Sequence, residues 1–442
     1  MSGKRDIKVL DINDNEHIYN EEGLLGEGGQ GAVYRTKDGD VALKIDNGDE
    51  TLQSFWEKIE QIIYKPLPKS DFALPLVLLK EKKGYIMKLL DNFKPLSILT
   101  PNGVNPNDFQ KQNIPFFLEG MYQANQTWAC KIAHYQNSGG LRVRLFILKR
   151  IACILSSLHL RGMAYCDLSP NNIFISQDDI PLIKFIDADN IEYHSRIKSS
   201  VYTPKYEIPE IDMGGNNSMY SDIYAFGILA FYLLSMVYPF IEEENDWDND
   251  ESKIKRIWEG EWIDSDNFEG EYREGLRGAL STKPLEALFS ATFEIGKLKP
   301  YLRPIMPLWI NTLETALNNT LKCPKCAMSY YDDYFDNCPY CNESKPLRAI
   351  VETKRAKFVH ELNPKLEVPL SLIEPIKLNE YKQETIFSLE KNKENIILKK
   401  ECDKLIKICN KKVQSQYKRP IGEFSNMQIE VDGHIVELKI EQ

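Results

Sequence analysis

A cluster of glycines near the start of the chain has the composition of a phosphate-binding hairpin. It lies between two stretches that alternate like β-strands and comprises Gly26, Glu27, Gly28, Gly29, Gln30 and Gly31. Because glycine has no β-carbon, the backbone amides of such a hairpin can approach a phosphate chain closely. The cluster precedes a strand, which disfavours a dinucleotide fold, where the phosphate binds at a helix N-terminus. Taken alone, a glycine-rich hairpin without a ligand fits the cluster equally well.

Lys44 lies in the segment VALKI, on the strand that follows the glycine cluster. Its apolar neighbours would anchor this strand while its ammonium group reaches the phosphates of a nucleotide, although an exposed strand lysine would leave the same pattern. Val33, two residues after the last glycine, would pack on an adenine face. We assign Ala42 to the same nucleotide site.

The glycine cluster and Lys44, at this spacing, resemble the start of the protein-kinase fold. The segment YCDLSPNN, residues 165–172, looks like the catalytic loop of that family, with Asp167 and Asn172 at the required interval. The resemblance implies that Asp167 accepts the proton of the substrate hydroxyl and that Asn172 binds magnesium through its amide oxygen. Asp187, in KFIDADN, stands where the family has its metal-binding aspartate. A turn rich in Asp, Asn and Pro is the structural alternative for residues 165–172.

The same resemblance predicts a partner for Lys44 and a hinge between two lobes. A glutamate on the helix after Lys44 should hold the lysine on the phosphates, and the sequence offers Glu57 and Glu60. We prefer Glu60, because Ile63 and Tyr64 would continue a turn that faces the core; both glutamates could also be solvated helix charges. The backbone of the hinge would read the adenine edge, and we assign this task to Met87 and Leu89.

Three later residues also match the family. Pro209-Glu210 resembles the end of the kinase activation segment, and Arg303 matches the late arginine, so the resemblance implies a buried, structural Glu210–Arg303 ion pair. Asp222 looks like the aspartate that braces the backbone of the catalytic loop. These matches favour protein kinases over kinases of small antibiotic molecules, which generally lack the segment.

Three departures from the family pattern concern regulation and acceptor specificity. Cys166 replaces the arginine that pairs with a phosphorylated activation loop in many kinases, so ordering of the loop by phosphorylation is not expected. Ser169 replaces a lysine that contacts the γ-phosphate in serine/threonine kinases. Ala188 and Asp189 replace the last two residues of the Asp-Phe-Gly motif. None of these changes removes the base or the metal ligands, and we interpret the chain as an active, divergent kinase.

Four cysteines form two tight pairs, CPKC and CPYC, with eleven residues between the pairs. This spacing is typical of a zinc ribbon, in which four thiolates close a tetrahedral structural site. Four unligated thiols are the alternative, but so short a segment has too little apolar area to fold without a metal. The predicted zinc ligands are Cys323, Cys326, Cys338 and Cys341.

Hydrophobic patterning predicts the elements that position these residues. Alternation after Tyr19 predicts an antiparallel sheet, whereas residues 145–160 have helical spacing and residues 221–236 form an apolar helix buried on all sides. From about Ala349 the chain suggests a small β-containing domain with a helix or two, and a charge-solvated appendage fits as well; Asp432-Gly433 predicts a tight hairpin turn. The predicted fold class is α+β: a two-lobed kinase fold over 22–317, a zinc ribbon over 320–343 and an accessory domain over 350–442.

Composition bears on the partners and the location that we expect for the protein. With 442 residues and 43% hydrophobic residues the chain can bury a large core, and its formal net charge of -10 indicates no nucleic-acid partner. The N-terminus lacks an apolar stretch and no later stretch is long enough to span a bilayer, so we expect a cytoplasmic protein without membrane contact.

We therefore predict a protein kinase that uses ATP and Mg²⁺, carries structural Zn²⁺ and phosphorylates serine or threonine in a protein substrate. Its overall style indicates bacterial signalling, and the ribbon or the C-terminal domain would bind a protein partner. The alternative from another class is a pseudokinase scaffold, which binds nucleotide without transferring phosphate.

Overall fold

The computed structural model describes residues 6–28, 31–104, 114–197, 203, 205–212, 214–240, 261–266, 268, 275–280, 282–376, 378, 384–424 and 426–441. The chain forms two compact units. Unit 1 comprises Met1–Leu96, Leu158–Tyr206 and Asn216–Asp222, and unit 2 comprises Ser97–Ser157, Glu207–Gly215 and Ile223–Gln442. The predicted α+β class, with a strand-rich first lobe, is confirmed.

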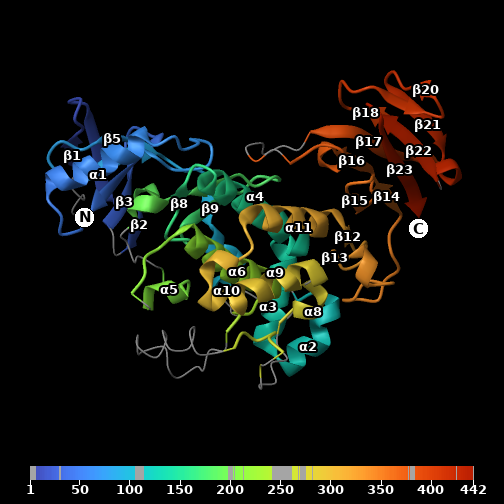
Figure 1. Cartoon of the computed structure of the whole chain (residues 1–442), viewed down its shortest axis with the longest axis horizontal. Helices are drawn as coiled ribbons and strands as arrows, with labels where there is room; N and C mark the ends of the chain where they lie inside the picture. The colour runs from blue at the N-terminus through green and yellow to red at the C-terminus, as the bar shows by residue number, and fades with distance from the viewer. Residues whose placement is uncertain are drawn as a thin grey trace. The chain divides into compact units, whose positions relative to one another are not determined.

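An antiparallel sheet forms the first part of unit 1, drawn in blue in Figure 1. Its strand order is β1-β2-β3-β4-β6-β5, so β6 pairs between β4 and β5. One face packs around Val9, Tyr19, Leu43, Leu79 and Ile86. The strands are β1 (Ile7–Leu10), β2 (Glu16–Gly28), β3 (Gly31–Thr36), β4 (Val41–Asp46), β5 (Pro75–Leu78) and β6 (Gly84–Lys88). Sequence patterning missed β1 and the first residues of β2, which extend the sheet before Tyr19.

Helix α1 (Leu52–Tyr64) follows β4 and packs on the other face of the sheet. Thr51 caps its N-terminus by accepting a hydrogen bond from the Ser54 amide, and Phe55 and Ile59 pack against Leu78 and Tyr85. Unit 1 also contains short strands before and after residues 165–172: β7 (Phe93–Pro95), β8 (Met163–Ala164), β9 (Ile173–Ser176), β10 (Ile183–Phe185) and β11 (Glu192–Tyr193). These strands pair as β10-β9-β7 and β11-β8.

Helices form the first part of unit 2. Phe226 of α6 and Phe289 of α9 both pack edge-on against Trp309 of α11, which is fully buried. The predicted helices are confirmed as α4 (Gly140–His159) and α6 (Met219–Ser235), and every residue of α6 from Ser221 on is buried. The other helices are α2 (Glu119–Ala124), α3 (Gln126–Asn137), α5 (Pro209–Asp212), α8 (Arg277–Leu280), α9 (Lys283–Phe293), α10 (Ile295–Leu298) and α11 (Met306–Asn318).

The cysteine module and the C-terminal strands complete unit 2. The module begins with the hairpin β12 (Thr320–Lys322) and β13 (Ser329–Tyr331). Arg142 of α4 forms two 2.7 Å hydrogen bonds with the carboxylate of Glu361 and also bonds Thr320, so the helices, the module and the C-terminal strands are joined at one point. Lys149 of α4 and Ser371 both bond Glu314 of α11.

The C-terminal region is a β-sandwich, drawn in red in Figure 1. One sheet has the order β15-β14-β23-β22-β19-β20 and the other β16-β17-β18-β21, and both contribute to a single apolar core. The strands are β14 (Arg348–Glu352), β15 (Lys357–Glu361), β16 (Lys365–Pro369), β17 (Thr385–Asn392), β18 (Asn395–Lys400), β19 (Ile406–Ile408), β20 (Lys411–Lys412), β21 (Gln416–Pro420), β22 (Met427–Val431) and β23 (His434–Glu441).

This sandwich decides between the two predictions for the C-terminal region. A shared apolar core excludes a charge-solvated appendage. The one or two helices that the sequence suggested were wrong for the described residues after 343, which contain only the 3₁₀ turns η10 (Leu370–Leu372) and η11 (Ile421–Phe424). The predicted hairpin at Asp432-Gly433 is confirmed, since both residues have positive φ between β22 and β23.

Candidate active site

One face of the unit 1 sheet gathers the residues assigned to the nucleotide. In the strand register Lys44 lies opposite Val33 on β3 and Tyr85 on β6, and Ala42 lies opposite Met87. Paired residues and residues two apart on a strand project from the same face of a sheet. Val33, Ala42, Lys44 and Met87 therefore share one face, as a nucleotide site requires.

The glycine hairpin joins β2 and β3. Gly26, Glu27 and Gly28 pair with Val33, Ala32 and Gly31, while Gly29 and Gln30 lie outside the described residues. Gly31 has φ +144°, and a β-carbon there would lie 2.0 Å from the carbonyl oxygen of Ile45. No other residue fits this position without moving β4, the strand that carries Lys44.

The ammonium group of Lys44 lies among acidic side chains. Its Nζ is 2.8 Å from Oδ1 of Asp187 and 3.4 Å from Oδ1 of Asp189, and the Lys44 side chain is 5% exposed. Burial disfavours the charged form, but Tyr85, Asp189 and Asp187 outweigh burial and hold the pKa of Lys44 well above its usual value. Lys44 is therefore a fixed positive charge in this site.

Asp167 is held by two side chains. Asn172 Nδ2 donates to Oδ2 of Asp167 at 2.8 Å, and the Thr203 hydroxyl donates to Oδ1 at 2.8 Å. Burial raises the pKa of Asp167 above the ordinary aspartate value of 3.8, against the effect of these two hydrogen bonds. A carboxylate with a raised pKa, oriented by two donors, has the properties of a general base.

Asp222 braces the backbone that leads into Asp167. Its two carboxylate oxygens accept hydrogen bonds from the backbone amides of Tyr165 and Cys166 at 2.8 and 2.9 Å, and Nε2 of His159 lies 2.9 Å away. Cys166 has φ +73°, a strained conformation for a residue with a β-carbon. The predicted brace is confirmed, and it stabilises the turn that presents Asp167.

Tyr165 connects the catalytic loop to the segment of Asp187. Its hydroxyl donates to the Ile186 carbonyl at 2.6 Å, and its ring packs edge-on against Phe185. Asp187 itself has φ +50°. The contact fixes the residue before Asp187 and thereby the direction of the Asp187 side chain.

Glu60, the α1 residue predicted to pair with Lys44, does not contact that lysine in the structure. Glu60 is exposed on α1, Glu57 accepts a hydrogen bond from Gln53, and the ion pairs of Lys44 in the described part of the chain are with Asp187 and Asp189. At the predicted hinge, Met87 belongs to β6, and the Leu89 amide donates to the Asp40 carbonyl at 2.9 Å.

The structural ion pair predicted in unit 2 is confirmed. Both guanidinium nitrogens of Arg303 bond the Glu210 carboxylate, at 2.7 and 2.8 Å, and Nε donates to the Gly296 carbonyl. The guanidinium also lies 4.6 Å from the ring centroid of Tyr224. Arg303 therefore ties the end of the activation segment to the helices of unit 2.

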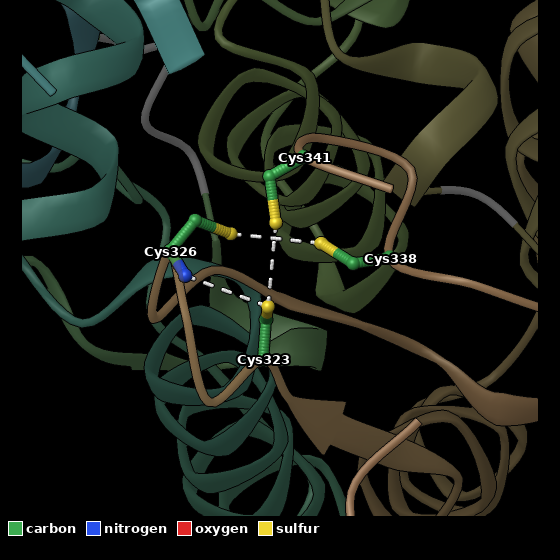
Figure 2. A group of neighbouring side chains, drawn as sticks. All are labelled: Cys323, Cys326, Cys338 and Cys341. Carbon is green, nitrogen blue, oxygen red and sulfur yellow. Dashed lines mark hydrogen bonds between the residues drawn. The ribbon is translucent and has the colours of Figure 1, made fainter. Parts of the chain in front are cut away.

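The four cysteines converge on one point, as Figure 2 shows. Their sulfur atoms all lie within 4.8 Å of one another, and the pairs Cys323–Cys341 and Cys326–Cys338 are 3.5 Å apart. The residue after each knuckle, Ala327 or Asn342, has positive φ, which turns the backbone around the sulfurs. Four thiols at this separation could bind a zinc ion tetrahedrally.

The cysteine module packs on the helical part of unit 2. The Gln136 side chain of α3 donates to the Cys326 carbonyl, and the ring of Tyr340 packs against Phe117. Residues of both Cys-x-x-Cys segments therefore contact the helical part of unit 2.

Sequence reasoning overlooked three contributors. The sequence assigns no task to Tyr165, Tyr85 or Thr203. The acidic residue at 189 was noted as a departure without a role. An acid in place of glycine beside a predicted metal ligand was the available signal for Asp189.

A buried lysine paired with a strand-end aspartate, together with a braced Asp/Asn loop, is an arrangement suited to phosphoryl transfer. Comparison with known proteins identifies the class more closely: residues 85–286 match the sequence family described as "Protein kinase domain". The match includes Asp167, Asn172 and Asp187 and begins after Lys44. Residues 85–286 of the chain are therefore similar to protein kinase domains.

Individual relatives agree with this family. The chain is 34% identical over 110 residues to serine/threonine-protein kinase D2 of Rattus norvegicus, covering 24% of this chain and 12% of that protein. It is 27% identical over 201 residues to serine/threonine-protein kinase YPK2/YKR2 of Saccharomyces cerevisiae, covering 41% of this chain and 29% of that protein. It is 36% identical over 110 residues to serine/threonine-protein kinase dkf-1 of Caenorhabditis elegans, covering 23% of this chain and 15% of that protein. The matched part thus spans less than a third of these relatives.

Proposed function

We propose that the chain is an active ATP-dependent protein kinase that phosphorylates serine or threonine hydroxyls of a protein substrate. The observation that carries this proposal is one connected set of contacts within unit 1. Lys44 pairs with Asp187, Tyr165 links Ile186 to the catalytic loop, and Asn172 and Thr203 orient Asp167. Names of the relatives support serine or threonine as the acceptor.

In this proposal each residue has one chemical task. Asp167 takes the proton of the acceptor hydroxyl while the hydroxyl oxygen forms a bond to the γ-phosphorus of ATP. The bond between the γ-phosphorus and the oxygen that bridges it to the β-phosphate breaks, and ADP leaves. Lys44 offsets charge on the phosphates. Thr203 and Asn172 hold the base so that one geometry is presented to the hydroxyl.

Two residues have suitable donor atoms for magnesium. Asn172 uses its amide nitrogen for the backbone and side chain of Asp167, so its amide oxygen is the atom left for a cation. Asp187 supplies a carboxylate, and hard cations prefer such oxygens. Bound Mg²⁺ would neutralise negative charge on the phosphates. Zn²⁺ is proposed at the four cysteines as a structural ion.

The remaining assignments extend this proposal. We assign the kinase domain to residues 22–317, the zinc ribbon to 320–343 and an accessory domain to 350–442. The ribbon or the accessory domain would bind a protein partner. None of the helices in the described residues combines the length and apolarity that crossing a bilayer requires. Cytoplasmic location and bacterial signalling are predictions from sequence alone.

A transfer assay tests the proposal directly. Purified chain is incubated with Mg²⁺, γ-labelled ATP and generic protein substrates such as histones and casein, beside Asp167→Ala and Lys44→Ala. Asp91→Ala, at a largely exposed residue, is the control for handling and folding. Label that appears on protein with the unaltered chain and the control, and disappears in both site variants, supports the proposal. Nucleotide binding without transfer in the unaltered chain would contradict it and favour the scaffold.

A further inference from the structure

Asp189 is buried against the ammonium group of Lys44. Its Oδ1 lies 3.4 Å from Lys44 Nζ, and the two side chains are 4% and 5% exposed. Asp189 belongs to the 3₁₀ turn η6 (Ala188–Asn190), immediately after Asp187. One short loop thus presents two carboxylates to the same lysine.

The two carboxylates cannot serve the same purpose in the proposed reaction. Asp187 is proposed as a metal ligand, and a cation would compete with Lys44 for its oxygens. A buried ammonium that loses its counter-charge is strongly destabilised. Asp189 would keep one negative charge on Lys44 while another N–H of the ammonium turns to the phosphates, since Lys has three donors.

The positive charges of Lys58 and Lys65, in and just after α1, agree with Asp189 as the partner of Lys44 and Asp187 as the metal ligand. Lys58 Nζ of α1 lies 3.9 Å from Oδ2 of Asp189. At the end of the helix, the buried Lys65 donates to the Ile191 carbonyl and lies 3.4 Å from Glu192. The helix thus presents positive charges to residues 187–192, whereas a glutamate directed there would repel Asp189.

We propose that Asp189 is a positioning residue that holds Lys44 for the phosphates, in the place of a glutamate from α1. The inference rests on the proposed kinase function for its purpose. The contact itself is independent of catalysis, so it can be tested by nucleotide binding as well as by turnover.

A double-mutant cycle on Lys44→Met and Asp189→Asn measures the coupling. Affinity for ADP is titrated without added Mg²⁺ in a buffer free of chelator, which leaves the proposed zinc site intact, and again in Mg²⁺. Each single variant is expected to weaken ADP binding without Mg²⁺ about tenfold, the value of one charge-assisted hydrogen bond. In the double variant the second change should cost less than about twofold, because the partner is already gone. Glu57→Gln, an exposed α1 variant, serves as the control, and thermal unfolding of every variant checks folding.

Turnover supplies the second measurement. Asp189→Asn should lower kcat of the transfer reaction about tenfold or more in the presence of saturating Mg²⁺. If the unaltered chain transfers no phosphate, the proposed function fails while the binding cycle still tests Asp189. Independent, multiplicative losses in the cycle would overturn the inference. So would an Asp189→Asn variant that only needs more Mg²⁺, or a Glu57→Gln control that weakens ADP binding as much as Asp189→Asn does.

Discussion

Glu210→Gln tests whether the Glu210–Arg303 pair stabilises unit 2. The Arg303 side chain is fully buried, and Glu210 is 15% exposed. Glutamine keeps one acceptor oxygen but faces the other guanidinium nitrogen with an N–H group, so one charge-assisted bond is lost, about 1.5–3 kcal/mol. The buried arginine also loses its counter-charge, and removing one partner of a buried pair typically costs about 3–5 kcal/mol. We expect a loss of about 3 kcal/mol in the free energy of unfolding, near the lower end of that range.

The assay is urea unfolding followed by tryptophan fluorescence, to which the buried Trp309 of unit 2 contributes. Asp91→Asn is the matched control, because it removes an exposed ion pair with Arg35 whose side chains are 63% and 45% exposed. Screening by solvent limits such a pair to about 1 kcal/mol or less. A Glu210→Gln loss no larger than that of the control would refute the view that this pair anchors the activation segment.

Three further predictions concern other parts of the molecule. Burial raises the pKa of Asp167 above 3.8, and the base must be ionised to accept a proton, so kcat/KM should fall as the pH decreases, with an apparent pKa above 3.8. A fall in kcat/KM with an apparent pKa at or below 3.8 would contradict the assignment of Asp167 as the base. The purified chain should contain about one zinc ion, and Cys326→Ser should lower both zinc content and the unfolding midpoint, whereas Cys409→Ser, at an exposed thiol outside the cluster, should change neither. Asp222→Asn should cost on the order of 2–3 kcal/mol in unfolding free energy and lower turnover, because the Cys166 amide or its neighbour loses a charged acceptor; unchanged turnover would mean that the brace does not position the base.

Contacts within short segments of the chain follow from local sequence features. The interval between Asp167 and Asn172 is a property of one short loop, and their hydrogen bond follows from that spacing. The Cys-x-x-Cys pairs likewise place their sulfurs by local geometry, and both pairs meet in the structure. Strand alternation predicted the sheet that carries Lys44, because side chains on a strand alternate between faces.

Partners that depend on distant segments were less predictable. The preference for Glu60 rests on its place on α1, but which side of a helix faces a loop depends on packing. In the structure Lys58 of α1 lies near Asp189, and Lys65, just after the helix, pairs with Glu192. The helices suggested for the C-terminal region were wrong because short apolar runs fit a buried strand and a buried helix alike. The start of the sheet was missed since β1 is only four residues long.

The amino-acid sequence by itself determined the identity and spacing of the chemical groups: a glycine hairpin, Lys44, an Asp/Asn loop and two cysteine pairs. Each of these is encoded within a few neighbouring residues, where backbone geometry limits the outcomes. The tertiary structure alone decided that Asp189, separated from Lys44 by 145 positions, shares the lysine with Asp187. Contacts across such distances depend on how whole elements pack, and packing is a collective property that no single segment contains.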